Sequence, residues 1–326
     1  MRIADAIQIG GIPINYILLD LEWNSAYSRK LGRFMNEILE IGAVKLSDDL
    51  EHISDFSCVV RSQLTGKVRN FVKELTSISN EEMSEGLPFN EAFTQFCYWL
   101  DDGNPYVIIT WSNTDLYVLL ENYRVFEGIN TIPFLQMYAD LQRYIQHIIA
   151  VPGRGQISLA SACEMMSIEI GDLSLHRAPD DAALCARILK NRFDRDRFNA
   201  YISVTDSAFY GRMAFKKHFI IDLNDPDIDQ TAFDFCCPQC KEPLARKGRL
   251  WLKSSAFNGR YICAGCSDEY IGTVRFRRTY DDTIIKRSIN RTESRAKKTK
   301  RADEVDQAVS EQAQKEESNV PAADKE

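Results

Sequence analysis

The stretch that decides the fold is residues 16–23, which read YILLDLEW. Apolar and aromatic residues are followed by two carboxylates one residue apart, a pattern that predicts a buried strand ending in charge. Positions two apart on a strand share a face, so Asp20 and Glu22 can converge on one point. Two anions this close repel each other unless a cation lies between them, and oxygen ligands suit Mg²⁺ or Mn²⁺. The alternative is a strand that runs out into a solvated acidic turn.

The composition is typical of a soluble globular protein. Hydrophobic residues make up 44% of the 326 residues and charged residues 27%, so the chain can form a full core and more than one unit. With a formal net charge of −7, a nucleic-acid partner would be held by a local basic surface or by metal ions. The 9 cysteines, together with the lack of an early apolar signal segment or a membrane-spanning run, lead us to expect a cytoplasmic protein without a membrane partner.

Strands come first along the chain and then alternate with helices. After the opening strand, residues 37–46 and 56–61 are expected to form two more strands in hairpin-like succession. Residues 106–111 form a fully apolar strand, which is followed by a helix. Amphipathic or capped helices are expected at 89–100, 116–123, 158–166 and 181–193. This order predicts an α/β fold in which helices flank a mixed sheet.

Three further residues stand where such a fold brings functional groups together. Asp115 follows the strand at 106–111, Asp181 lies in the first turn of a late helix, and His176 precedes Asp181 by five positions. Each has a simpler explanation, because a carboxylate at a helix start offsets the helix dipole and a lone histidine is often only hydrogen-bonded. A central first strand would nevertheless bring all three residues to the end of the sheet that carries Asp20.

The composition changes near residue 230. Cys237, Cys240, Cys263 and Cys266 form two Cys-x-x-Cys turns, a pattern typical of a zinc ribbon with one structural Zn²⁺. The alternative is four buried thiols in an ordinary core.

Cations alternate with aromatic residues over 246–253 and 275–278. This pattern is typical of nucleic-acid surfaces, although a solvated basic face would look the same. Beyond residue 285 apolar residues become too few to offset the entropy cost of ordering, so we expect a disordered charged tail.

Together these motifs resemble those of the DEDDh 3′→5′ exonucleases, which belong to the ribonuclease-H-like superfamily. The family's Asp-x-Glu motif matches residues 20–22. Its Thr-Trp-Gly-x-x-Asp motif matches residues 110–115, with Ser112 in place of the glycine. Its third motif, a histidine followed five residues later by Asp-Ala, matches residues 176–182.

Two connecting segments add to the resemblance, which covers roughly residues 14–195. Residues 37–43 and the Glu-Leu-Thr-x-Ile segment within 71–78 resemble the branch that contains sporulation-inhibitor and RNA-trimming exonucleases. The family often has Thr or Phe after the motif glutamate, whereas this chain has Trp23. That side chain could stack on a base or pack into the core.

The resemblance implies a five-stranded ribonuclease-H-like sheet and phosphodiester hydrolysis with two Mg²⁺ or Mn²⁺ ions. Asp20 would bridge both ions. Glu22 and Asp181 would complete the ion on the side of the attacking water, and Asp115 would serve the leaving-group side. His176 would act as the general base.

The same resemblance implies a substrate and products. The partner would be single-stranded nucleic acid, RNA or DNA, with a free 3′ end, and the products would be nucleoside 5′-monophosphates. The alternative is a nucleic-acid-binding or regulatory module that keeps the fold with weak turnover. The complete set of ligands and an intact His176 favour the enzyme.

These observations divide the chain into four parts. We expect an exonuclease domain over residues 1–200, a linker over 201–230, a zinc ribbon over 231–284 and a disordered charged tail over 285–326.

Overall fold

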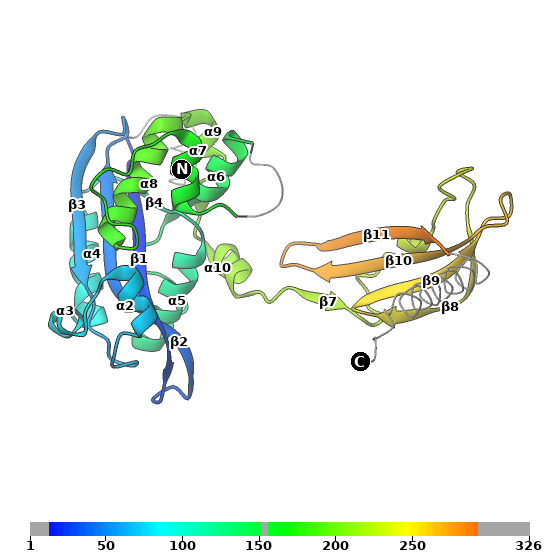
Figure 1. Cartoon of the computed structure of the whole chain (residues 1–326), viewed down its shortest axis with the longest axis horizontal. Coiled ribbons are helices and arrows are strands. Elements are labelled where there is room, and N and C mark those ends of the chain that lie inside the picture. The colour runs from blue at the N-terminus through cyan, green and yellow to red at the C-terminus, as the bar shows by residue number, and fades with distance from the viewer. Residues whose placement is uncertain (1–12, 151–155, 293–326) are drawn as a thin grey trace, which may run out of the picture. The chain divides into compact units, whose positions relative to one another are not determined.

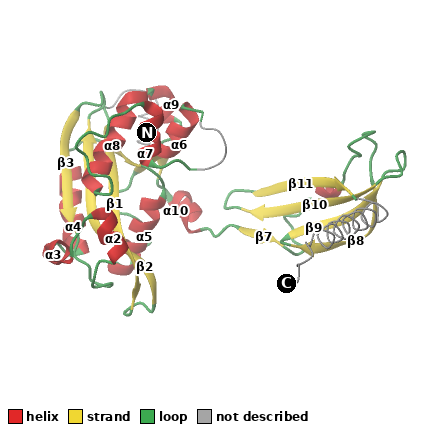
Figure 2. Cartoon of the chain, in the orientation of Figure 1, coloured by secondary structure: helices red, strands yellow, loops and turns green. Residues whose placement is uncertain are grey.

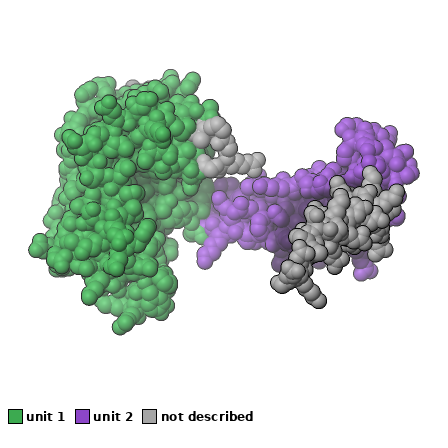
Figure 3. All heavy atoms as spheres, viewed as in Figure 1, with its two compact units in different colours: residues 1–214 green, residues 215–326 purple. Residues whose placement is uncertain are grey.

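The computed structural model describes residues 13–150 and 156–292. The chain forms two compact units, the first ending at Ala214 and the second beginning at Phe215 (Figures 1 and 3). Within these ranges, none of the helices combines the length and the apolar character needed to cross a membrane.

The first unit is built on a mixed sheet with the strand order β3-β2-β1-β4-β5-β6. β1 is antiparallel to β2 and parallel to β4, so it lies in the middle of the sheet. The strands are β1 (Asn15–Ser28), β2 (Arg33–Leu46), β3 (His52–Val59), β4 (Tyr106–Thr110), β5 (Met137–Asp140) and β6 (Ser203–Val204). The predicted mixed α/β sheet is confirmed, and the short β6 adds an edge to the five strands that were expected.

Helices cover both faces of this sheet (Figure 2). They are α2 (Asn70–Thr76), α3 (Asn80–Glu85), α4 (Phe89–Leu100), α5 (Thr114–Phe126), α6 (Leu141–Ile148), α7 (Leu159–Met166), α8 (Ala178–Arg192), α9 (Arg195–Asn199) and α10 (Ser207–Ala214).

The side chains of β1 alternate between two cores. Tyr16 and Leu18 are buried with residues of α6, α7 and α8, whereas Ile17 and Leu19 are buried with residues of α4 and α5. Because the alternation has a period of two, Asp20 continues the row that faces α8. The pairing with β4 ends at Leu18, but β1 continues past Asp20 and Glu22 to Ser28, so the strand does not end in charge as expected. These two carboxylates, the acidic segment of β1, lie next to the point where β4 turns away toward α5.

The first turn of α8 lies directly on the backbone of β2 at Gly42, which pairs with Asp20. A Cβ atom at Gly42 would lie 2.0 Å from the carbonyl carbon of Ala178 and 2.1 Å from the nitrogen of Pro179. Only a residue without a side chain fits there, and this close approach places the start of α8 over the acidic segment of β1.

The second unit is a five-stranded sheet in which β7 (His218–Ile220) pairs with β10. The other strands are β8 (Ala245–Lys253), β9 (Ala256–Ile262), β10 (Glu269–Arg278) and β11 (Thr283–Arg291). One face packs on aromatic residues, including Phe233 of the 3-10 helix η1 (Gln230–Phe233) and Phe235.

Residues 201–230, which we expected to be a linker, contain α10 and β7. Phe209 is buried with residues of α4 and α5 in the first unit, and Ile220 is buried in the core of the second unit, so apolar contacts order both segments. The expected tail began at residue 285, but β11 continues to Arg291, and residues 293–326 lie outside the described part of the chain.

The contact at Gly42 yields a stability prediction. Gly42→Ala should lower the free energy of unfolding by about 1–3 kcal/mol or more, because backbone atoms rather than flexible side-chain ends occupy the space. Gly103→Ala is the control, since nothing lies within 4 Å of the added Cβ there and its cost comes only from placing alanine at a φ of 81°. Thermal unfolding of both variants makes the comparison. Equal losses would show that α8 does not depend on the close approach.

Candidate active site and metal centre

The five residues that the motifs singled out line one pocket of about 550 Å³ in the first unit. Asp20 and Glu22 lie in the middle of β1, just before the register shift between Glu22 and Trp23, and Asp115 comes from the first turn of α5. His176 precedes α8, and Asp181 lies in the first turn of that helix. The structure thus brings together all the residues that sequence reasoning placed at this end of the sheet.

His176 and Asp181 are held relative to each other by the backbone. His176 has a left-handed conformation with φ 69°, and its N–H donates to Oδ2 of Asp181 over 3.2 Å. Ligand atoms of Glu22, His176 and Asp181 lie within 4.8 Å of one another. The imidazole is exposed to solvent, so it can exchange protons with water at the pocket.

Burial and mutual repulsion raise the pKa values of the carboxylates. Burial, then Asp115 and Asp181, hold the pKa of Asp20 well above its usual range. Burial followed by the charge of Asp181 raises the pKa of Glu22 to about 8, and burial raises that of Asp115 to about 7. Such a cluster keeps its negative charge at neutral pH when cations lie among the carboxylates, and hard oxygen donors suit divalent ions. The residues therefore fit a divalent metal centre.

A buried ion-pair network fixes the start of α8, and sequence reasoning assigned it no role. Glu40 of β2 has no exposed surface, and it accepts from the backbone N–H of Ala178 at 3.0 Å and from Nε of Arg177 at 3.1 Å. Arg177 also donates to Glu82 at 2.9 Å. The sequence signal was a charged residue inside an otherwise apolar strand, which requires a buried partner.

A second buried carboxylate organises the opposite wall. Glu37 accepts hydrogen bonds from the backbone N–H groups of Gln63, Leu64 and Thr65 at 2.5–2.9 Å. This loop leads into α2, which contributes Phe71 to the pocket.

Asn24 connects that loop to β1. Its amide donates to Oγ1 of Thr65 and to the carbonyl of Lys67, each at 2.9 Å, and its Oδ1 accepts from the N–H of Arg69. The residue after Trp23 therefore fixes the position of α2 against the pocket.

The pocket wall offers apolar and aromatic surface. Phe71 is 71% exposed and Leu75 38% exposed, although both are apolar. Trp23 lines the pocket and is also partly buried against the core of α4 and α5, so it makes core contacts and faces the pocket at once.

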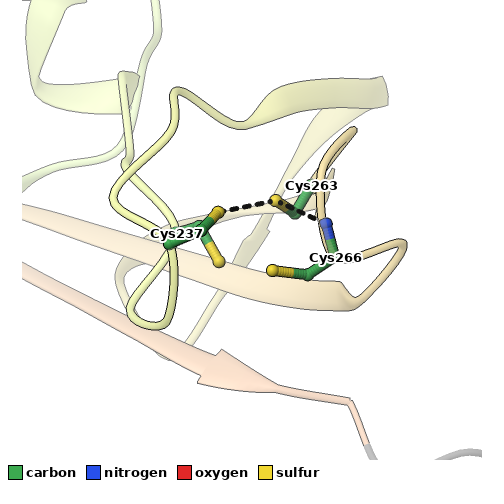
Figure 4. Close-up of side chains that lie close together, drawn as sticks. Cys237, Cys263 and Cys266 are labelled. Carbon is green, nitrogen blue, oxygen red and sulfur yellow. Dashed lines mark hydrogen bonds between the residues drawn. The ribbon is translucent and has the colours of Figure 1, made fainter.

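The four predicted cysteines of the second unit form one cluster. Their Sγ atoms lie within 4.8 Å of one another, and those of Cys240 and Cys263 are 3.4 Å apart. Figure 4 shows the sulfur atoms of Cys237, Cys263 and Cys266 gathered between two turns of the chain. In tetrahedral zinc sites, Zn–S bonds of about 2.3 Å place the sulfur atoms about 3.8 Å apart. The cluster is therefore compatible with zinc.

Neighbouring groups shift the pKa values of the clustered thiols in opposite directions. The hydroxyl of Tyr270 lies 3.4 Å from Sγ of Cys237 and lowers the pKa of that thiol to about 6. Hydrogen bonding to Cys240, followed by burial, raises the pKa of Cys266 to about 12, so this thiol ionises at neutral pH only when a cation lies beside it. Soft thiolate donors in this arrangement select zinc rather than magnesium.

Comparison with known proteins identifies the class. Residues 19–189 match the model of the exonuclease family named after ribonuclease T. The chain is also 31% identical over 180 residues to the probable 3′-5′ exonuclease KapD of Bacillus subtilis, covering 53% of this chain and 82% of the relative. The chain therefore belongs to this exonuclease family. It is an enzyme of the 3′–5′ exonuclease class, as the motifs predicted, and members of the family use divalent metal ions.

Two solved structures share the fold of the first unit. The nuclease domain of 3′hExo, a DEDDh family member bound to rAMP, has a TM-score of 0.51 and 21% identity, covering 58% of this chain and 96% of that chain. A 3′-exonuclease that recognises the 3′ end of a histone mRNA stem-loop has a TM-score of 0.50 and 20% identity, covering 58% and 84%. These likenesses support the ribonuclease-H-like architecture.

The cysteine cluster yields a prediction about metal content. Cys263→Ser should release one zinc ion per chain and unfold much of the second unit, because structural zinc contributes folding energy directly. Cys236→Ser is the matched control, since Cys236 is an exposed neighbour outside the cluster. Elemental analysis and circular dichroism provide the readouts. Full zinc content in the Cys263 variant would exclude this cysteine as a ligand.

Proposed function

We propose that the chain is a metal-dependent 3′–5′ exonuclease that releases nucleoside 5′-monophosphates from single-stranded RNA or DNA. The observation that carries this proposal is the convergence of Asp20, Glu22, Asp115 and Asp181 with His176 in one pocket. A binding module without turnover has no need for repelling buried carboxylates beside an exposed imidazole.

The four carboxylates would hold two Mg²⁺ or Mn²⁺ ions, with Asp20 shared between them. When bound, such ions offset the charge of the phosphate and promote ionisation of a water. Asp20 suits the shared position because Asp115, Asp181 and Glu22 all act on its charge. Glu22 and Asp181 lie together with His176, so they would serve the side of the attacking water.

His176 would accept the proton of the attacking water, a role that contributes about 10²–10⁴-fold to the rate. Its exposed ring can pass that proton on to solvent, while the hydrogen bond from its backbone to Asp181 holds the loop in place. Glu40 fixes Arg177, the residue that directly follows His176, and this contact keeps the imidazole of His176 at the pocket.

The aromatic wall would bind the terminal nucleotide. Trp23 and Phe71 offer flat apolar surfaces to a base or sugar, and Arg69 offers a positive charge to a phosphate. A wall of this kind can accept an unpaired base of any identity, which favours single-stranded ends.

The first test of the proposal is Asp20→Asn, which should lower kcat by at least about a hundredfold, because metal ions contribute several kcal/mol to the transition state. Thermal stability in a chelator should be unchanged or higher, since the substitution relieves repulsion among buried carboxylates. Asp49→Asn, at an exposed turn, is the control and should keep full activity. Retention of about a tenth of the rate at saturating Mg²⁺ would exclude the shared-ligand role.

The second test concerns the polarity of digestion. A single strand with a 3′-phosphate should resist hydrolysis, whereas the same strand with a 5′-phosphate should be degraded one nucleotide at a time. Gel analysis of strands labelled at the opposite end follows both reactions. Rapid cutting of a circular single strand would show endonuclease activity and contradict the proposal.

A further inference from the structure

The sheet of the second unit has two chemically different faces. On β10, Tyr270, Val274 and Phe276 are buried in the core of this unit. Because side chains alternate along a strand, Arg275 and Arg277 point to the opposite side. We name that side the outer face.

Strand pairing gathers cations and aromatic residues on the outer face. Phe219 of β7 and Ile284 of β11 pair with Arg277 from its two sides, and Lys286 pairs with Arg275. Trp251 of β8 pairs with Asn258, which in turn pairs with Thr273. Residues that pair directly across neighbouring strands share a face of the sheet. The outer face therefore carries Phe219, Trp251, Arg260, Arg275, Arg277 and Lys286.

The aromatic rings remain accessible between these cations. Phe219 is 40% exposed and Trp251 is 38% exposed. The guanidinium carbons of Arg275 and Arg277 lie 5.4 Å and 5.9 Å from the ring centroid of Phe219. An exposed ring flanked by cations offers a stacking surface to a base and positive charge to the phosphates beside it.

Acidic residues are largely kept off this face. Within the five strands themselves, as described, Glu269 at the start of β10 is the one carboxylate; it lies on the outer face and pairs with Lys247 over 3.1 Å. On the core side, by contrast, Arg278 and Arg291 form ion pairs with Asp227 and Asp268. The outer face therefore keeps a net positive charge.

We propose that the outer face binds single-stranded nucleic acid, with bases against Phe219 and Trp251 and phosphates beside Arg275, Arg277 and Lys286. A duplex keeps its bases stacked on one another and would engage only the cations, so a single strand fits the surface better. The choice of single-stranded nucleic acid as the ligand rests on the proposed function, because the bound polymer is then the substrate of the enzyme. A strand held by the second unit raises the effective concentration of its 3′ end for the first unit.

The stacking part is tested with neighbouring residues of β8. Trp251→Ala is compared with Leu252→Ala, because Leu252 is 46% exposed but pairs with Phe257 and so lies on the other face. Both substitutions are made in the full chain that also carries Asp20→Asn, so that the bound nucleic acid is not hydrolysed during the measurement. Fluorescence anisotropy measures the Kd for 5′-labelled single-stranded RNA and DNA. Each oligonucleotide has about 20 nucleotides, which is longer than the stretch that one binding site covers. Trp251→Ala should raise Kd about fivefold or more, whereas Leu252→Ala should not.

The phosphate part is tested by salt dependence. Arg277→Ala with Lys286→Ala should reduce the slope of log K against log salt by about 1.4, since each lost contact to a single strand removes about 0.7. Arg246→Ala is the control, because Arg246 is exposed but pairs with Tyr261, whose side chain lies in the core. Zinc content and circular dichroism verify that each variant is folded.

The outcomes separate this proposal from the enzymatic one. Unchanged Kd values and salt slopes in both outer-face variants would overturn it, as would equally tight binding of a fully paired duplex. The same substitutions in the active chain should leave hydrolysis of a dinucleotide unchanged. Failure of the unsubstituted chain to hydrolyse any strand would contradict the proposed function and leave the binding result standing.

Discussion

The proposed active site of the first unit depends on the contact between the first turn of α8 and the backbone of β2. No side chain fits at Gly42, so Ala178 and Pro179 lie directly on the strand that pairs with Asp20. Glu40, two residues before Gly42 on β2, fixes the same turn by accepting from the N–H of Ala178. Two constraints, one steric and one electrostatic, therefore place His176 and Asp181 over the acidic segment of β1, and a shift of this turn would separate them from Glu22.

The same packing creates an electrostatic conflict that the proposed metal ions would resolve. Burying Asp20 among Asp115, Asp181 and Glu22 raises the pKa values of these groups, which is unfavourable for an isolated protein. The fold tolerates the cost because residues 15–19 of β1 are buried and their apolar side chains pack into two separate cores. The proposed function of this site thus depends on repelling carboxylates that the stability of the surrounding core holds together.

The second unit has a small core that is rich in aromatic side chains and lies against one face of its sheet. For a core of this size, a bound metal is a common source of stability. The cysteine cluster lies at the turns, where it can join the segment before β8 to the turn between β9 and β10. The outer face takes no part in this core, so cations and aromatic residues can lie there.

The sequence by itself determined the buried strand that carries Asp20 and Glu22, the identity of the five pocket residues and the cysteine pairs, but not the continuation of that strand to Ser28. These follow from local periodicity and from spacing, which are written in neighbouring residues. Only the tertiary structure decided the roles of Glu40 and Gly42, the division at residue 214 and the grouping of cations with exposed aromatic residues on one face of the second sheet. Each of these depends on partners distant in the chain, such as Arg177 for Glu40, and strand register determines which residues share a face.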